Sequence, residues 1–480
     1  MLVDLKRALL NPIYSKTTMA SSGCIMKCAA ILILSVIIML GGVAARNLHG
    51  SNLHDFPTGG GVEELVFAKN ISFRIPITYQ LSSHPPYIHL HDSSTIINAD
   101  KEHLKKIFTG EVTRSSTGAY VVFALIGTQH YPMKLSLDIT SDLTWVQCKP
   151  CEQCYPKYNA VYNPANSSTF MNTMCQDHYC KIEADNYYKI EVDRVMRFCT
   201  DDRRCLFGHA YRDDKNIMGS LVSDYFEFQE MAGTEKAFHS HLTFGCAHST
   251  IGSFNREVDG VLGLGGGPFS LISQLEISAF SHCLPPPNSG KTSYILFGDA
   301  AQTRGPGAYM IVNRRFPSRY YLKLHNIALL DHQKKITLDG VPSNTFAIDA
   351  DRFGGFYLDI GTPFINLPQV AYHELRKVLH STLLAYNIRP IVSSDPSDFC
   401  FETSFDDVKH ISLVFAVSLH DLIITGNQLI YENFDSKGVI CLGVVESKSK
   451  ETILGRNAQT NRNIGYDFEV GLITFQDMEC

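Results

Sequence analysis

From Gly118 onwards, apolar residues occur in short runs that are separated by glycine, proline and polar residues. Runs of this kind, rich in β-branched and aromatic residues, predict β-strands joined by turns. We expect strands at residues 119–127, 133–137, 242–244, 294–297, 320–324, 439–444 and 471–475. Helical periodicity is sparse: it is clearest at 368–385, which begins with a proline suited to a first turn, and a shorter helix is expected at 268–275. The pattern predicts an all-β fold, mainly antiparallel, with few short helices.

The first 117 residues do not follow this pattern. Residues 28–45 form an apolar run that is preceded by basic residues and ends in small ones, which is typical of a signal peptide cleaved near Ala45. The run is also about long enough to span a bilayer, so an uncleaved membrane anchor is the alternative. Residues 46–117 are polar and rich in histidine, with one short helix expected at 100–108. They are either a linker or a prosegment that covers an acidic cleft until it is removed.

Composition narrows the class of protein. The chain has 480 residues, 45% of them hydrophobic and 19% charged, with a formal net charge of −6 and no long basic run, which argues against nucleic-acid binding. Two of the 14 cysteines, Cys24 and Cys28, lie near the N-terminus, and the other twelve follow from Cys148 to Cys480. In an exported chain these twelve predict disulfides, although the spacing from Cys148 to Cys154 also resembles that of metal ligands. Sequons at Asn70 and Asn166 predict N-glycosylation of an exported chain.

One local pattern occurs twice. Leu137-Asp138-Ile139 is followed by Thr140-Ser141, and Leu358-Asp359-Ile360 by Gly361-Thr362. An apolar stretch closed by glycine follows each of them, at 260–265 and at 452–455, where we expect close backbone approach. Either motif alone is common turn chemistry, but the repeat indicates a duplicated fold with a shared pair of carboxylates. Such a pair can hold one proton between two acids, so that one carboxylate activates water while the other protonates a peptide carbonyl.

Residues 118–480 resemble the pepsin-like aspartic proteases, and most closely the plant nepenthesin-like group. The resemblance rests on the two Asp motifs, on the stretch SDLTWVQCKPCEQC at 141–154 and on the order of the twelve cysteines. It implies a bilobal fold with the active-site cleft between an N-terminal lobe at 118–310, which carries a cysteine-rich insertion, and a C-terminal lobe at 311–480. It further implies a monomer with catalytic residues Asp138 and Asp359, a polypeptide substrate, and no cofactor or metal.

The resemblance also implies further site residues and a disulfide pairing. Ser141 and Thr362 would support the two carboxylates, and Tyr211 would lie on a flap after Cys205, with its hydroxyl near the first aspartate. The implied disulfides are Cys148–Cys151, Cys154–Cys246, Cys175–Cys205, Cys180–Cys199, Cys283–Cys480 and Cys400–Cys441. Spacing alone does not select this pairing.

The motifs depart from the family pattern at their centre. Ile139 and Ile360 stand where active members have hydroxyl residues that hydrogen-bond across the pair, and isoleucine can neither donate nor accept. Thr140 replaces a glycine, which would strain the loop if that position needed a positive φ. Arg212 and Asp214 replace flap glycines.

We expect a secreted or vacuolar aspartic endopeptidase, made as a proenzyme and weakened around its carboxylates. We expect the protein to associate with a membrane only if the apolar segment at 28–45 stays uncleaved. The alternative is a non-catalytic secreted binding protein or enzyme inhibitor with the same fold.

Overall fold

The computed structural model describes residues 73–80, 118–155, 161–181, 195–211, 215–229, 237–287, 289–391, 399–418, 420–432 and 438–480. The chain divides into a unit of residues 1–67 and a compact unit of residues 68–480, and every described residue belongs to the second. The apolar run at 28–45, the expected helix at 100–108 and the sequon at Asn70 lie outside the described residues. Among the helices that are described, none combines the length and the apolar character needed to cross a bilayer.

The first half of the described chain is almost entirely strand. Its elements are β1 (Phe73–Gln80), β2 (Ala119–Ile126), β3 (Tyr131–Asp138), β4 (Trp145–Gln147), η3 (Pro164–Asn166), β5 (Met171–Asn172), α3 (His178–Lys181), β6 (Val195–Cys199), β7 (Cys205–Ala210), β8 (Asn216–Gln229), β9 (Ala237–Ile251), β10 (Gly260–Gly263), α4 (Leu271–Gln274), β11 (Ala279–Cys283), β12 (Thr292–Phe297) and η5 (Gly298–Ala300). Antiparallel hairpins join β2 to β3, β7 to β8 and β8 to β9.

The second half adds the long helix. Its elements are β13 (Gly307–Ile311), β14 (Tyr321–Leu322), β15 (Leu324–Asp331), β16 (Lys334–Thr337), β17 (Phe356–Leu358), β18 (Ile365–Leu367), α5 (Gln369–Leu384), β19 (Pro390–Ile391), β20 (Cys400–Glu402), α6 (Phe405–Val408), β21 (Ile411–Val417), β22 (Asp421–Ile424), α7 (Gly426–Leu429), β23 (Ile430–Glu432), β24 (Val439–Leu442), β25 (Val444–Glu446), β26 (Thr452–Leu454), η6 (Arg456–Gln459), β27 (Arg462–Asp467) and β28 (Leu472–Asp477). The expected fold class, mainly antiparallel β with few short helices, is confirmed.

Helix α5 follows from its sequence. Pro368 stands at the N-cap, and the buried side chains of Ala371, Tyr372, Leu375 and Leu379 recur at the three- and four-residue spacing of one helical face. This face packs on β15 and β25. Burial of each leucine in that contact stabilises the fold by about 1.5–3 kcal/mol.

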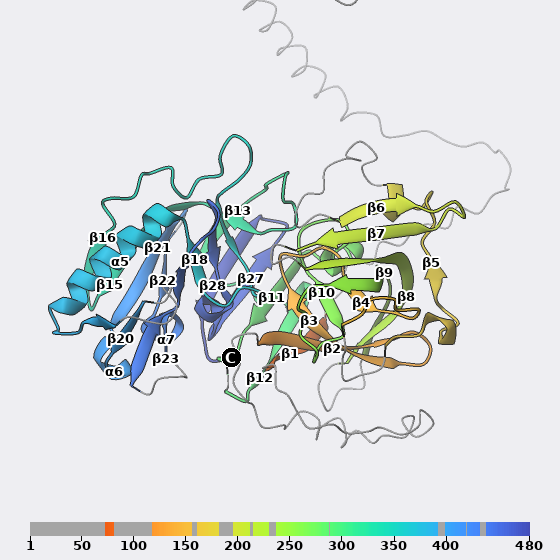
Figure 1. Ribbon diagram of the computed structural model, residues 1–480, viewed down its shortest axis with the longest axis horizontal. Coiled ribbons are helices and arrows are strands. Elements are labelled where there is room, and N and C mark those ends of the chain that lie inside the picture. The colour runs from red at the N-terminus through yellow and green to blue at the C-terminus, as the bar shows by residue number, and fades with distance from the viewer. Residues whose placement is uncertain are drawn as a thin grey trace, which may run out of the picture. The chain divides into compact units, whose positions relative to one another are not determined.

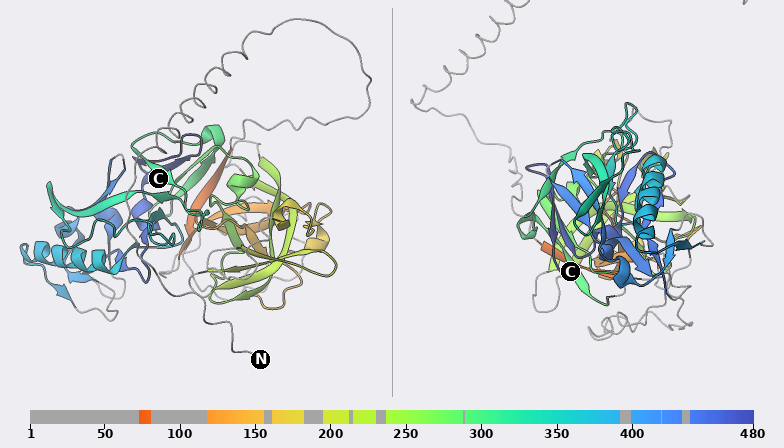
Figure 2. Two further views of the ribbon diagram at one scale, coloured as in Figure 1. Left: turned by 90° about the horizontal axis from the view of Figure 1, so that it is seen from above. Right: turned by 90° about the vertical axis from the view of Figure 1, so that its left-hand side faces the viewer.

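One continuous sheet links the two halves of the chain. Strand β11 pairs antiparallel with β27 along five residue pairs, and β13 pairs with β28. In Figure 1 the strands β1–β10 lie on one side of β11 and β27, whereas β15, β16, β20–β22 and α5 lie on the other, and Figure 2 shows the same division from above. At this junction the ring of Phe280 stacks on that of Tyr466, with centroids 4.2 Å apart.

The internal repeat expected from the sequence has a counterpart in strand pairing. In the first half, β3 runs parallel to β10, β10 antiparallel to β4, and β4 parallel to β9. In the second half, β17 runs parallel to β26, β26 antiparallel to β18, and β18 parallel to β25. The two sets have the same order and the same directions. Each Asp motif therefore occupies the same place in its own half, at the end of β3 or directly after β17.

Strand β1 was not expected, because it lies within the polar segment at 46–117. It pairs antiparallel with both β12 and β2, and Ile75 and Ile77 are fully buried. The alternating apolar positions of FRIPITYQ carry the period of a half-buried strand, and this signal was missed next to the surrounding polar residues. Part of the expected prosegment is thus built into the sheet.

Six disulfides connect the twelve cysteines, but four of the implied pairs are wrong. The structure joins Cys283 to Cys480 and Cys400 to Cys441, as the resemblance implied. Instead of Cys148–Cys151 and Cys154–Cys246 it contains Cys148–Cys246 and Cys151–Cys154. Instead of Cys175–Cys205 and Cys180–Cys199 it contains Cys175–Cys199 and Cys180–Cys205.

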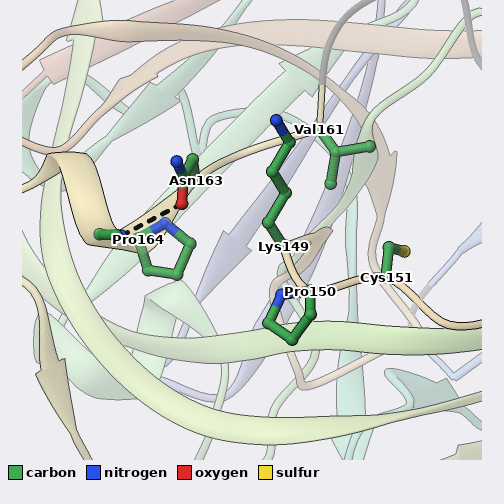
Figure 3. Close-up of a pocket in the computed structure, with 7 residues that line it drawn as sticks. Lys149, Pro150, Cys151, Val161, Asn163 and Pro164 are labelled. Atoms are coloured by element: carbon green, nitrogen blue, oxygen red, sulfur yellow. Dashed lines mark hydrogen bonds between the residues drawn. The ribbon is translucent and has the colours of Figure 1, made fainter.

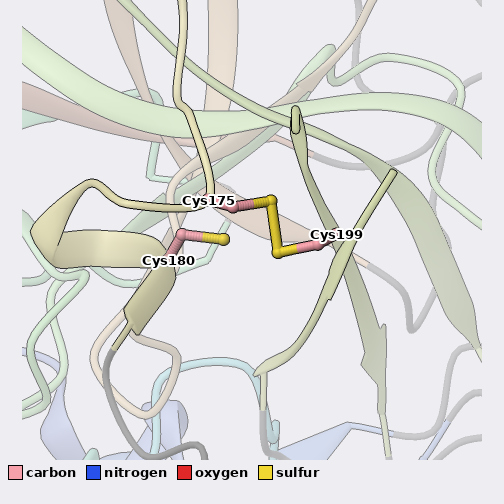
Figure 4. A group of neighbouring side chains, drawn as sticks. All are labelled: Cys175, Cys180 and Cys199. Atoms are coloured by element: carbon pink, nitrogen blue, oxygen red, sulfur yellow. A yellow bond between two sulfur atoms is a disulfide. The ribbon is translucent and has the colours of Figure 1, made fainter. Parts of the chain in front are cut away.

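Strand register explains the observed pairs. Cys246 on β9 lies opposite Val146 of the parallel strand β4, so Cys148, just beyond the end of β4, is within reach, with a Cα–Cα distance of 5.2 Å. Cys199 and Cys205 are directly opposite each other on β6 and β7, and each bonds to a cysteine of the segment 175–180. Figure 4 shows the resulting cluster, in which the sulfur of Cys180 lies near the Cys175–Cys199 bridge. Sequence spacing carries no information about such cross-strand neighbours.

The pairing is directly testable. Mass spectrometry of non-reduced peptides should recover a fragment that links Cys148 to Cys246 and no fragment that links Cys154 to Cys246, because strand register places Cys148 and not Cys154 beside Cys246. A Cys154–Cys246 fragment as the main product would contradict the observed register.

Candidate active site

The first candidate aspartate lies at the end of a paired strand. Asp138 is the last residue of β3, and its backbone carbonyl accepts a hydrogen bond from Leu264 N at 2.8 Å, just beyond β10. Its Oδ1 accepts three hydrogen bonds, from Thr140 N at 2.8 Å, from Thr140 Oγ1 at 2.8 Å and from Ser141 N at 3.1 Å. Three donors on one oxygen hold the carboxylate in a fixed orientation.

The second candidate aspartate is built in the same way. Asp359 follows β17, and its backbone N–H donates to Leu454 O at 3.1 Å, at the end of β26. Its Oδ1 accepts from Gly361 N at 2.7 Å, and its Oδ2 accepts from Thr362 Oγ1 at 2.6 Å. In both loops the N–H two residues after the aspartate thus donates to Oδ1. The predicted equivalence of the two motifs therefore extends to this hydrogen bond.

Glycines at the ends of β10 and after β26 allow each loop to pass close by, as their spacing predicted. A Cβ atom on Gly263 would lie 2.3 Å from the Asp142 carbonyl oxygen, and one on Gly455 would lie 2.1 Å from the Phe364 carbonyl oxygen. Both distances are far below van der Waals contact. A side chain at either position would therefore displace the loop that carries the neighbouring aspartate.

Thr140 behaves differently from expectation. Thr140 is not among the described non-glycine residues that have a positive φ. The strain expected from replacing a glycine is therefore absent. Its side chain instead adds a hydroxyl donor to Asp138 that has no counterpart at Gly361. The expectation of a strained first loop is wrong, because the loop does not use a left-handed backbone at this residue.

Ile139 and Ile360 lie inside the protein. Ile139 is 0% and Ile360 2% exposed, and both belong to the main hydrophobic cluster, which contains buried side chains from both halves of the chain. Each therefore contributes about 1.5–3 kcal/mol of apolar burial to folding. At these two positions an apolar side chain is packed in the core in place of a polar one.

The two residues expected to support the carboxylates differ. Thr362 donates its hydroxyl to Asp359, whereas Ser141 contacts Asp138 only through its backbone N–H. The buried Ser141 Oγ has no hydrogen-bond partner among the described residues. A buried hydroxyl without a partner costs free energy that an apolar side chain of similar size does not.

This asymmetry predicts opposite outcomes for two conservative substitutions. Ser141→Ala is expected to leave the free energy of unfolding unchanged or to raise it by about 1 kcal/mol, because it removes a polar group without a partner. Thr362→Val is expected to lower the free energy of unfolding by about 1–2 kcal/mol, because the hydrogen bond that it removes goes to a charged group. Urea unfolding of the two variants measures both. Equal destabilisation by both would contradict the asymmetry.

Tyr211 lies where a flap was expected. It follows β7 directly, and its hydroxyl accepts a hydrogen bond from Nε1 of Trp145, the only tryptophan in the sequence, at 2.7 Å. Its backbone N–H donates to Lys215 O across the turn between β7 and β8, and residues 212–214 of that turn lie outside the described part. The described contacts of the Tyr211 hydroxyl thus include Trp145, seven residues after Asp138.

Asp142 is a buried acid that the sequence interpretation overlooked. It follows the first motif directly, and its Oδ1 accepts from Gly267 N at 2.8 Å. The Ser318 side chain also hydrogen-bonds to its carboxylate. Burial raises the pKa of Asp142 to about 6, against the lowering effect of these two hydrogen bonds. The sequence held a weak signal for it, since Asp142 is the only charged residue between the motif and Trp145.

A second overlooked group lies behind the other loop. Gln459 Nε2 donates to Leu454 O at 2.7 Å and to Asp359 O at 3.2 Å, and its Oε1 lies 3.3 Å from His282 Nε2. His282 is fully buried, and its Nδ1 has no hydrogen-bond partner among the described residues. Burial lowers the pKa of His282 to about 4, although the hydrogen bond to Gln459 acts in the opposite direction. This histidine is neutral above that pH and supports the Asp359 loop through Gln459.

A surface pocket lies away from these residues. A pocket of about 650 Å³ is lined by residues 149–151, 161 and 163–165, and none of the candidate catalytic residues lines it (Figure 3). Asn166, the second predicted glycosylation site, is exposed at the end of η3 near this pocket. Its glycosylation stays a prediction.

Comparison with known proteins agrees with the geometry. Residues 120–299 match the family model described as Xylanase inhibitor N-terminal, and residues 319–477 match Xylanase inhibitor C-terminal. Aspartic proteinase nepenthesin-2 from Nepenthes gracilis is 28% identical over 371 residues, which cover 76% of this chain and 78% of that protein. Aspartyl protease 37 from Oryza sativa subsp. japonica is 30% identical over 398 residues, which cover 76% of this chain and 81% of that protein. The solved structure of Basic 7S globulin from soybean has a TM-score of 0.58 at 20% identity and covers 76% of this chain and 94% of that one.

Proposed function

Because the chain belongs to the pepsin-like aspartic protease family, we propose that it is an exported endopeptidase that hydrolyses peptide bonds at acidic pH through Asp138 and Asp359. The observation that carries this proposal is the equivalence of the two loops. Each ends a strand paired parallel with its partner, and each carboxylate accepts from the N–H two residues further on. Six disulfides are typical of a chain that matures in the secretory pathway.

The chemistry needs one proton shared between two acids. The ionised carboxylate takes a proton from a water molecule that attacks the peptide carbonyl carbon, and the protonated one donates to the carbonyl oxygen. Hydrogen bonds from Thr140, Gly361 and Thr362 fix the two carboxylates before substrate arrives, so less reorientation is needed at the moment of reaction. No metal or organic cofactor takes part in this scheme.

The substrate in this proposal is an extended polypeptide that lies beneath the hairpin of β7 and β8. Tyr211 is held by Trp145 at the end of that hairpin, which gives the flap a fixed base. We further propose that the protein acts as a monomer outside the cell or in the vacuole, after removal of a prosegment.

A second candidate function is a secreted binding protein or inhibitor of another enzyme. Two observations favour it: the buried apolar side chains of Ile139 and Ile360, and the match to family models named for xylanase inhibitors. The intact pair of held carboxylates favours the protease, because a binding protein has no chemical need for two aspartates in equivalent loops.

Incubation of the purified protein with an unfolded polypeptide separates the two functions. At about pH 4 we expect new peptide fragments by mass spectrometry, and at about pH 7 much slower cleavage, because the shared proton is lost as both acids ionise. Recovery of intact polypeptide at both pH values, with the protein folded, would support the binding protein instead.

The two isoleucines provide a graded prediction. Ile139→Thr together with Ile360→Ser would allow a hydrogen bond between the loops and is expected to raise kcat by about ten-fold, equivalent to about 1.4 kcal/mol. The same change should lower the free energy of unfolding by about 2–5 kcal/mol, because buried methyl and methylene groups are lost. Thr140 is kept in this variant, since it donates to Asp138.

Steady-state kinetics and urea unfolding of the double variant and of each single variant measure these effects. A single substitution should raise kcat less than the double, because a hydrogen bond between the loops needs both hydroxyls. A stable double variant with unchanged kcat would show that the missing hydroxyls do not limit the reaction.

A further inference from the structure

Two histidines and an aspartate meet at the turn between β15 and β16, on a sheet that does not carry Asp359. Asp331 ends β15 and pairs with Ile411, the first residue of β21, so His410 lies beside the turn. His332 follows Asp331 in the turn with a φ of 51°. The possible ligand atoms of Asp331, His332 and His410 all lie within 4.8 Å of one another.

The two rings are stacked, and the carboxylate lies at the edge of one of them. The imidazoles of His332 and His410 are parallel, with centroids 4.1 Å apart and an interplanar angle of 6°. His410 Nε2 lies 3.3 Å from Asp331 Oδ1. His410 Nε2 is buried, and it makes no hydrogen bond of proper geometry with any described residue. A buried nitrogen that makes no hydrogen bond and lies 3.3 Å from a carboxylate oxygen is suited to bind a further group, and His332 can join it by turning out of the stack.

A neighbouring tyrosine holds the carboxylate. Tyr386 Oη donates to Asp331 at 3.0 Å from Oδ1 and 3.1 Å from Oδ2. The side chains of Asp331 and His410 are each only 15% exposed, whereas His332 is exposed. Two groups are therefore fixed, and the third can adjust.

We propose that Asp331, His332 and His410 bind a divalent transition metal ion, with Zn²⁺ as the best match. Imidazole nitrogens and one carboxylate oxygen are ligands that Zn²⁺ prefers, at about 2.0–2.2 Å from the ion. Tetrahedral coordination at that radius places ligand atoms about 3.3 Å apart. The pair His410–Asp331 already has this separation, so only the exposed His332 has to move. Water would complete the shell, and Tyr386 would orient the ligating carboxylate from outside it.

Other clusters fit the same ion less well. Glu227 is flanked by His130 at 2.9 Å and by His239 at 3.6 Å, but both imidazoles are more than half exposed. Cys175, Cys180 and Cys199 also lie close together, but their sulfur atoms are bonded in disulfides and are not thiolates. Ca²⁺ and Mg²⁺ prefer oxygen ligands, which form a minority of this set.

The site lies apart from the carboxylate pair and goes beyond the proposed peptidase function. A bound ion would connect the β15–β16 turn to the start of β21 and close one end of the sheet formed by β16, β15, β21 and β22. Its expected consequence is a higher unfolding temperature in the presence of Zn²⁺, since an ion held by three ligands binds the folded state more tightly than the unfolded chain.

The test is a calorimetric titration of the full, disulfide-bonded chain, made without a histidine tag, with Zn²⁺ alone. We expect one strong site. His332→Asn is expected to weaken binding by at least about ten-fold, and His410→Gln by about a hundred-fold, because each removes a ligand. Asparagine tolerates the left-handed backbone of His332, so this variant folds even if His410→Gln does not. Mg²⁺ should not compete.

His130→Asn is the matched control. His130 also stands in a hairpin turn at a positive φ, 49°, beside a carboxylate, so its substitution removes an equivalent imidazole from a different place. Zn²⁺ binding should be unchanged in this variant. Undiminished Zn²⁺ binding in His332→Asn would overturn the proposal and would mean that the ion binds at another site, such as the histidine-rich segment at 84–91. Equal weakening in His130→Asn would also overturn it.

Discussion

Asp359→Asn is expected to lower the rate of peptide hydrolysis at acidic pH by at least about a thousand-fold, because asparagine can neither take a proton from water nor donate one to a carbonyl. The fold should tolerate the change. The amide oxygen can still accept from Gly361 N, and the amide nitrogen can donate to Thr362 Oγ1, so both hydrogen bonds of the loop are replaced. Asp138→Asn should lower the rate for the same reason, and the fold should tolerate it, because one amide oxygen can accept from the three donors that converge on Asp138 Oδ1.

Asp349→Asn is the matched control for both substitutions. Asp349 also holds a turn through its Oδ1, which accepts from Asp351 N at 3.0 Å and from Phe353 N at 2.9 Å, but it lies outside the two motifs. Its substitution should leave the rate within about two-fold, as expected for a surface change away from the reacting groups. Loss of activity in Asp349→Asn as large as in Asp359→Asn would mean that the assay reports folding and not catalysis.

The second large effect is on how the free energy of unfolding depends on pH. The pKa of Asp142 is raised to about 6 in the folded protein, above the ordinary value of about 3.9. The folded state therefore takes up this proton first, and the group stabilises the fold as pH falls from about 6 to about 4. Two pKa units correspond to about 3 kcal/mol.

His282 has the opposite sign in almost the same window. Its pKa is lowered to about 4, below the ordinary value of about 6.5, so the unfolded state takes up this proton first. The fold loses the corresponding free energy, again about 3 kcal/mol, as pH falls from about 6.5 to about 4. In the natural protein the two contributions nearly cancel.

Single substitutions should separate the two opposing contributions of Asp142 and His282 to the pH dependence of stability. Asp142→Asn is expected to make the free energy of unfolding fall by about 3 kcal/mol more than in the natural protein between about pH 6.5 and about pH 4. His282→Gln is expected to make it rise by a similar amount over the same range, and the double variant should return to the natural slope. Urea unfolding at the two pH values measures all four proteins. If the free energy of unfolding depended on pH in the same way in all four proteins, the pKa of neither group would differ between the folded and unfolded states.

The sequence was sufficient for the fold class and for the two Asp loops. Alternating apolar positions, and the glycines that close the stretches at 260–265 and 452–455, act locally, so period and spacing reveal them. Strand β1 escaped because its eight residues are surrounded by polar ones, although Ile75 and Ile77 alternate as in any half-buried strand. A single short strand in a polar segment carries too little pattern to be separated from a linker.

Residues whose roles depend on distant partners could not be predicted. The partner of Cys148 is decided by the register of β4 on β9, which involves residues about a hundred positions away. The pKa values of Asp142 and His282 are shifted by burial and partly restored by hydrogen bonds with residues far off in the chain, Ser318 and Gln459. The strain predicted at Thr140 was wrong because the backbone angle of a residue, unlike its identity, cannot be read from a sequence.

The most direct measurement of the central claim is kcat/KM for one peptide substrate from about pH 2 to about pH 8. Because a shared proton requires one carboxylate to be ionised and the other protonated, we expect a bell-shaped profile with its maximum at acidic pH. The profile should disappear in the double variant Asp138→Asn, Asp359→Asn. Activity that persists in the double variant, or no hydrolysis at any pH by the folded natural protein, would contradict the assignment of these two aspartates as the catalytic pair.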